Sequence, residues 1–152
     1  MIILVTTFIS VFALVSASLI IASIANTKRQ QKFNEKYLQF LRQHEGVALF
    51  CYTNRLAFCG AIESVIIPQL DKHVQIVKLI GKDPQTDLDK EYIAHMLFNL
   101  KEVGFPNVMR IVNGRVIDRS LHRLIYNSIN NNTANKLPLL VNNALNALGN
   151  TR

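Results

Sequence analysis

The chain has 152 residues, about the length of one domain, with a net charge of +7 and a hydrophobic fraction of 49%. Its two cysteines are too few for a disulfide framework, and its four scattered histidines lack metal-ligand spacing, so we expect no metal and no other cofactor. The sequence motifs of serine hydrolases, P-loop nucleotide hydrolases and zinc proteases do not occur, which argues against these enzyme classes.

Residues 1–26 contain no charged side chain. This apolar run is long enough to cross a bilayer core of roughly 30 Å, so we expect a single transmembrane helix that contacts lipid through residues 2–25. A cleaved signal peptide is the alternative, because residues 23–25 (Ser-Ile-Ala) form a small-x-small site before Asn26. The missing basic region at the start and the length of the apolar run favour the anchor.

Basic residues follow the apolar run directly and predict its orientation. They are Lys28, Arg29, Lys32 and Lys36. By the positive-inside rule this flank stays in the cytoplasm, where its side chains would meet anionic headgroups. We therefore expect a single-pass membrane protein with a cytoplasmic domain. The alternative is a domain on the exported, periplasmic or lumenal side.

Apolar spacings of three and four residues predict an amphipathic helix in the juxtamembrane segment 27–45. Its apolar stripe is expected to consist of Phe33, Tyr37, Leu38 and Leu41, with Phe40 outside it. The pattern then predicts, in order, a strand over 47–53, a helix over 60–72, a strand over 73–81 and a helix over 88–103 that is capped by Asp87 or Asp89 and ends at Gly104.

The second half of the chain contains a hairpin signal. Two strand-like runs in 107–118 flank Asn113-Gly114, and they are followed by predicted helices over 119–129 and 138–148, the latter with Pro138 in its first turn. A strand–helix–strand unit implies a parallel pair with a right-handed crossover, and the hairpin adds antiparallel strands. We expect an α/β domain over 46–131 with a mixed central sheet and helices on both faces, followed by a tail, 132–152, with a short helix.

Four arginines cluster along the hairpin and the helix after it: Arg110, Arg115, Arg119 and Arg123, with His122 among them. Two interpretations are open. They form a binding site for an anionic partner, or they form a solvated face of strand and helix. No nucleic-acid motif with interleaved aromatic residues accompanies them, so we do not expect nucleic acid as a partner.

The order of the predicted elements resembles that of a known family, and two stretches of the sequence strengthen the resemblance. "FCGAIESVIIPQL", residues 58–70, and "GFPNVMRIVNGRVID", residues 104–118, resemble the two signature regions of the thioredoxin family. The resemblance implies a thioredoxin-like sheet, a catalytic thiol at Cys59 and a cis-proline at Pro106. It also implies partner contacts through Phe58, Gly60, Phe105 and Pro106. Pro68 falls one residue later than the helix-kinking proline of the family.

The main departure from the family lies beside Cys59. Where the family has a second cysteine, this chain has Ile62, so a mixed disulfide formed at Cys59 would have no neighbouring thiol to resolve it. A helix N-terminus and Arg55 would favour the Cys59 thiolate, whereas Glu63 would oppose it. Cys51 is either a resolving thiol or a packed core residue.

Three functions remain open at this stage. The first is a membrane-anchored protein-binding or assembly module without dithiol turnover, with an unidentified protein partner. The second is a monothiol thiol-disulfide oxidoreductase that uses Cys59. The third is a structural subunit of a membrane complex, for which the small-residue spacings Ala13-x-x-x-Ala17 and Ser18-x-x-x-Ala22 would allow close helix contact.

Overall fold

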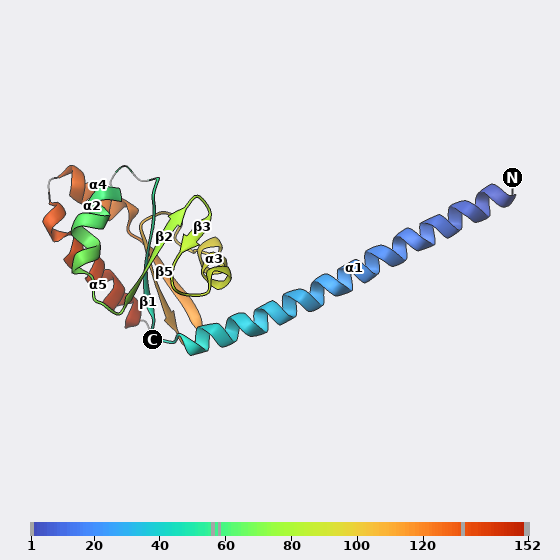
Figure 1. Cartoon of the computed structure of the whole chain (residues 1–152), viewed down its shortest axis with the longest axis horizontal. Coiled ribbons are helices and arrows are strands. Elements are labelled where there is room, and N and C mark those ends of the chain that lie inside the picture. Colours follow the sequence, from blue (N-terminus) through green and yellow to red (C-terminus); the bar gives the residue numbers. More distant parts are fainter. Residues whose placement is uncertain (1, 56, 58, 132, 151–152) are drawn as a thin grey trace. The chain divides into compact units, whose positions relative to one another are not determined.

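The computed structural model describes the backbone of residues 2–150 except 56, 58 and 132, and the side chains of residues 23–150 with the same gaps. The chain divides into two units, Met1–Gln39 and Phe40–Arg152 (Figure 1). The first unit consists of helix, and the second holds the sheet and the remaining helices.

Helix α1, Ile2–Gln43, runs from the first unit into the second. The rings of Phe33 and Tyr37 stack within it with centroids 6.1 Å apart, as the predicted stripe requires. Leu38, however, is 48% exposed and Phe40 is buried, so the predicted membership of the stripe is wrong at these two positions. Phe40 is buried because its ring packs on Tyr92, with centroids 5.0 Å apart.

The expected membrane anchor cannot be compared with the structure in detail, because the side chains of residues 1–22 lie outside the described part. Among the side chains that the structure does describe, no helix is long and apolar enough to cross a membrane.

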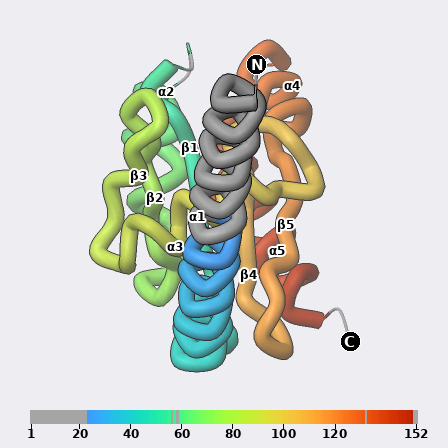
Figure 2. The backbone as a smooth tube through the Cα atoms, turned by 90° about the vertical axis from the view of Figure 1, so that its right-hand side faces the viewer, coloured from blue at the N-terminus to red at the C-terminus, as the bar shows by residue number. Residues whose placement is uncertain are grey.

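Five strands form one mixed sheet in the order β3-β2-β1-β4-β5 (Figure 2). They are β1 (Ala48–Thr53), β2 (Val74–Ile80), β3 (Asp83–Gln85), β4 (Asn107–Val112) and β5 (Arg115–Ser120). Strands β1 and β2 are parallel, and all other neighbours are antiparallel. The predicted mixed α/β sheet is therefore confirmed. Strand β3 was not expected, and its buried Pro84 is tolerated because β3 is an edge strand.

Helices cover both faces of the sheet (Figure 1). On one face lie α4 (His122–Asn130), α5 (Leu137–Gly149) and a helical segment, residues 59–69, made of α2 (Cys59–Ala61), a π turn η1 (Ile62–Ile66) and a 3-10 turn η2 (Ile67–Gln69). On the other face lies α3 (Lys90–Phe98). Alternation along β1 divides its side chains between these layers, because successive residues of a strand point to opposite faces.

The hydrophobic core cluster joins β1 and β4 to the helices of the first face. Its buried members are Phe50, Tyr52, Ile62, Ile66, Val108, Leu121, Ile125, Leu137, Val141, Ala144, Leu145 and Leu148. Five of these come from α5, so the segment 132–152, which sequence analysis set apart as a tail, contributes to the same core as the sheet. Pro138 lies in the first turn of α5, as predicted.

Helix α3 ends five residues before the predicted position. Asp89 caps its start, since its Oδ1 accepts hydrogen bonds from the N–H groups of Glu91 and Tyr92 at 3.0 and 3.4 Å. Beyond the helix, the carboxylate of Asp118 accepts from the N–H groups of Lys101 and Glu102 at 3.1 and 2.8 Å. These long-range bonds replace helical ones, and Val103, predicted on the apolar face, is 89% exposed.

Two other helix boundaries also differ. The predicted helix over 60–72 ends at Gln69, because Leu70 is extended with ψ 153°. The predicted helix over 119–129 begins at His122, because Arg119 and Ser120 still pair with β4 in the hairpin. The hairpin turn itself is confirmed: Asn113 and Gly114 have φ values of 53° and 66°.

Docking of α5 is expected to carry much of the stability of the domain. Leu145 is 3% exposed and Leu139, on the same helix, is 63% exposed. We expect Leu145→Ala to lower the free energy of unfolding by about 2–5 kcal/mol because it leaves a cavity in the core. The matched control Leu139→Ala should change it by less than about 0.5 kcal/mol. Urea denaturation followed by circular dichroism measures both, and equal losses would contradict this packing.

Candidate functional site

Cys59 begins the helical segment that follows β1. Strands β1 and β2 are parallel, so their carboxyl ends lie at the same end of the sheet. Strand β4 is antiparallel to β1 and begins at that end, with Asn107 opposite Cys51. The thiol and the Phe105–Pro106 peptide therefore belong to the same end of the domain. Phe58, predicted to contact a partner, lies outside the described residues. Gly60 is exposed at this end, with no atom within 4 Å of a Cβ placed there.

One carboxylate oxygen organises the side chains around Cys59. Glu63 Oε1 accepts hydrogen bonds from Lys78 Nζ at 2.7 Å, from the Tyr52 hydroxyl at 3.0 Å and from the Cys59 thiol at 3.6 Å. Tyr52 and Lys78 are direct partners in the parallel ladder of β1 and β2, so both side chains point to the face that carries Glu63. The Lys78 ammonium also lies 5.9 Å from the centre of the Tyr52 ring.

These contacts fix the charge states of the cluster. The hydrogen bond from Lys78, and after it the one from Tyr52, lowers the pKa of Glu63, so this residue is a carboxylate at neutral pH. The same bond raises the pKa of Lys78, which stays an ammonium. Burial, together with Glu63, raises the pKa of Tyr52, which stays a neutral donor.

The thiol of Cys59 is held in its protonated form. Burial raises its pKa, and the charge of Glu63 and its hydrogen bond raise it further, while Lys78 acts in the opposite direction. The opposition predicted from Glu63 is thus present at 3.6 Å. Arg55 is exposed and is not among the groups that shift this pKa. The α-helical turn that begins at Cys59 spans three residues, and a π turn follows it.

Ile62 takes the position at which the resemblance implies a second cysteine. Its side chain is completely buried in the hydrophobic core cluster, and Cys59 also packs against this cluster. Cys51 is completely buried as well, and burial raises the pKa of its thiol. Its side chain points to the opposite face of the sheet, because Phe50 and Tyr52 on either side of it belong to the cluster beneath Cys59. Cys51 is therefore a core residue and has no path to a disulfide at Cys59.

The Phe105–Pro106 bond is cis, as the resemblance implies. Pro106 is buried, and its carbonyl accepts the Leu121 N–H at 2.8 Å. The carbonyl of Phe105 lies 2.8 Å from His122 Nδ1, so it is already hydrogen-bonded. Phe105 itself is half-buried, so part of it is accessible to a partner.

Phe105 lines an apolar groove of about 540 Å³ between α3 and the end of β2. The other lining residues are Leu79, Gly81, Lys82, Ala94, His95, Leu97 and Phe98. Phe98 is 89% exposed, and Ile80, next to the groove in sequence, is 50% exposed. Cys59 is not a lining residue. The sequence-predicted partner residues therefore separate, with Phe105 in the apolar groove and Cys59 and Gly60 beside Glu63.

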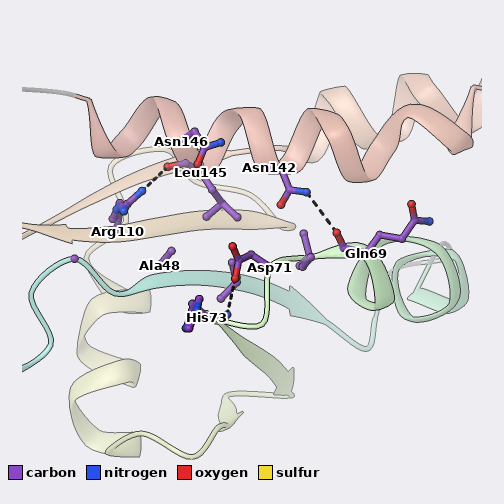
Figure 3. Close-up of a pocket in the computed structure, with 11 residues that line it drawn as sticks. Ala48, Gln69, Asp71, His73, Arg110, Asn142, Leu145 and Asn146 are labelled. Atoms are coloured by element: carbon purple, nitrogen blue, oxygen red, sulfur yellow. Dashed lines mark hydrogen bonds between the residues drawn. The ribbon is translucent and has the colours of Figure 1, made fainter.

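The four candidate arginines separate as well. Arg110 lies on the α5 side of β4, where its Nη1 donates to the Leu145 carbonyl at 3.3 Å in a cavity near the end of α5 (Figure 3). A cation in this place stabilises a helix C-terminus. Arg115 is exposed beside the hairpin turn. Arg119 and Arg123 line a different cavity, between α4, α5 and β5. They do not form one site.

Sequence reasoning missed Tyr52 and Lys78. The spacing of Cys59 and Glu63, four residues apart, was visible in the sequence. The placement of Lys78 above Tyr52 depends on the register of β1 and β2, in which these residues are paired. The alternation of β2 alone shows that Lys78 shares a face with Ile76 and gives no partner for it.

Removal of the Glu63 charge is expected to lower the pKa of Cys59. In Glu63→Gln the carboxylate that disfavours the thiolate is lost, while the ammonium of Lys78, 2.7 Å from Glu63, remains. The pH midpoint of iodoacetamide alkylation, followed for each cysteine peptide by mass spectrometry, should shift downward relative to the native chain. The exposed Glu91→Gln in α3 serves as control and should leave the midpoint in place. An unchanged or higher midpoint in Glu63→Gln would contradict this electrostatic account.

Comparisons with models of protein families, with curated proteins and with solved structures find no match to this chain.

Proposed function

We propose that this chain is a membrane-attached, thioredoxin-like domain that binds a protein partner and does not turn over disulfides. The observation that carries the proposal is the apolar groove formed by α3, the end of β2 and Phe105. The strand order β2-β1-β4-β5, the thiol after β1 and the cis peptide before β4 support the thioredoxin-like assignment.

The groove has the composition of a protein-binding surface. Leu79, Leu97 and Phe105 line it, and Phe98 leaves 89% of its surface exposed beside it. Large aromatic residues that are exposed without cover are typical of sites that a partner desolvates. The single cation at the rim, Lys82, is exposed and makes no ion pair within the described part of the chain.

These features favour one kind of partner. We infer that the groove takes an extended segment of another protein, in which an apolar or aromatic side chain enters between Phe98 and Phe105. An acidic residue beside it would pair with Lys82. Redox turnover is not required for such binding, and the cluster around Glu63 keeps the neighbouring thiol protonated.

A monothiol oxidoreductase remains the second candidate, because Cys59 is partly exposed and a thiol reagent can reach it. The two functions differ in which residue they need. Partner binding needs the groove, and mixed-disulfide exchange needs Cys59.

Partner recovery under reducing conditions distinguishes these functions. Full-length chain purified from its native membranes with its bound partner should retain that partner in Cys59→Ser. In Phe98→Asp the recovered partner should fall at least about tenfold, since a desolvated carboxylate replaces an aromatic contact. Leu139→Asp, at a leucine that is 63% exposed on α5, is the matched control. Loss of the partner in Cys59→Ser, or its release by reductant alone, would favour the monothiol function.

The membrane attachment is proposed from the sequence. The uncharged run 1–26 and the basic residues that follow it support an anchor with the domain in the cytoplasm. We expect the full chain to stay with the membrane pellet after extraction at alkaline pH and a variant without residues 2–25 to be released. Release of the full chain, or an N-terminus that begins at Asn26, would favour a cleaved signal peptide.

A further inference from the structure

The cavity between α4, α5 and β5 is not used by the proposed function. Its volume is about 500 Å³, within the range of small-molecule sites. Arg119 reaches it from β5, Arg123 from the first turn of α4, and Asn143 from α5. The rest of the lining is Glu102, Ser120, Leu121, Leu124, Leu140 and Ala144. Three elements therefore contribute two arginines and an asparagine to the lining of one cavity.

The charged side chains in the first turn of α4 have the opposite sign to those that stabilise the N-terminus of an isolated helix. An N-terminus carries a partial positive charge and is stabilised by acidic residues. The first turn of α4 has none, and it begins with His122 and Arg123. The capping residue, Leu121, offers no side-chain acceptor, and the N–H groups of Arg123 and Leu124 have no acceptor within the part of the chain that the structure describes.

Neither Arg119 nor Arg123 forms an ion pair within the described part of the chain. The ion pairs in this part of the chain are Lys78–Glu63 and Lys90–Asp83. Glu102 is the one acidic residue of the lining, and its Oε2 accepts a hydrogen bond from the N–H of Ser120 at 3.0 Å. Two exposed arginines and one carboxylate, Glu102, line the cavity beside the N–H groups of the first turn of α4. The lining therefore keeps a net positive charge, which an anion of the right shape would offset.

We propose that this cavity binds the terminal phosphate of an organic phosphate through Arg119, Arg123 and the first turn of α4. The planar fork of each guanidinium fits two oxygens of an oxyanion, and helix N–H groups fit a third. A tetrahedral phosphate monoester presents three oxygens at once, whereas a carboxylate presents two. The cavity is larger than inorganic phosphate, so it has room for the organic part. That part is either a soluble molecule or the headgroup of a phospholipid.

Amide chemical shifts of the full-length chain in neutral detergent micelles test this proposal. On titration with inorganic phosphate or glycerol phosphate, the amides of Arg123 and Leu124 should shift in a saturable way. Arg119→Gln and Arg123→Gln should each weaken binding about tenfold, and Arg123→Lys should also weaken it, since the charge stays but the fork is lost. Arg115→Gln, at an arginine beside the hairpin turn that does not line this cavity, should bind within about twofold of the native chain, because solvent and salt screen a surface charge that does not contact the ligand.

Two further measurements show whether the bound phosphate belongs to a soluble molecule or to a lipid headgroup. Bicelles of phosphatidylcholine with phosphatidic acid, compared with bicelles of phosphatidylcholine alone, report headgroup binding at the same amides. Saturable shifts with glycerol phosphate or with phosphatidic acid support the proposal and assign the soluble or the lipid source. The absence of saturable shifts with all of these probes overturns it. An equal loss of affinity in Arg115→Gln also overturns it, because binding would then follow surface charge and not this cavity.

Discussion

The carboxylate of Glu63 is the interaction on which the site end of this domain depends. A single oxygen accepts from Lys78 of β2, Tyr52 of β1 and the Cys59 thiol, so it joins two strands to the helical segment above them. The Lys78–Glu63 pair is partly exposed, with side chains that are 35% and 42% accessible, and water screens much of its attraction. Its main consequence is chemical. A negative charge beside the thiol disfavours the thiolate, which is the form that attacks disulfides.

The strands and the hairpin followed from local patterns. A short apolar run predicted β1, and alternation with β-branched residues predicted β2, each within one or two residues of its bounds. Asn113-Gly114 predicted the turn between β4 and β5. The helix boundaries were harder, because distant residues set them. The apolar period of α3 continues to Val103, but Asp118 takes the N–H groups of Lys101 and Glu102 and removes those residues from the helix. No sequence window around α3 contains Asp118.

The same reason limits what the sequence predicts about the site. Cys59, Phe105 and Pro106 were found through local motifs, and the cis peptide at Pro106 agrees with the motif. The partners of Cys59 were not found, because Tyr52 and Lys78 meet through strand register. The arginines form a cluster in sequence and separate in space. Arg110 reaches α5, while Arg119 and Arg123 meet where β5 is followed by α4.

Ile62 has a packing role that a cysteine at the same position would not fill. Its side chain is completely buried with Phe50, Tyr52 and α5, so it contributes the burial of a branched aliphatic side chain, about 1.5–3 kcal/mol. A cysteine there would leave a smaller group in the same space and would place its thiol in the core. Burial also raises the pKa of a thiol, which makes it a poor nucleophile. The helical segment therefore packs the core at the position where the resemblance to the thioredoxin family implies a second cysteine. The Cys59 thiol lies beside the Glu63 carboxylate, so the proposed partner binding rests on the apolar groove that Phe98 and Phe105 line, and not on thiol chemistry.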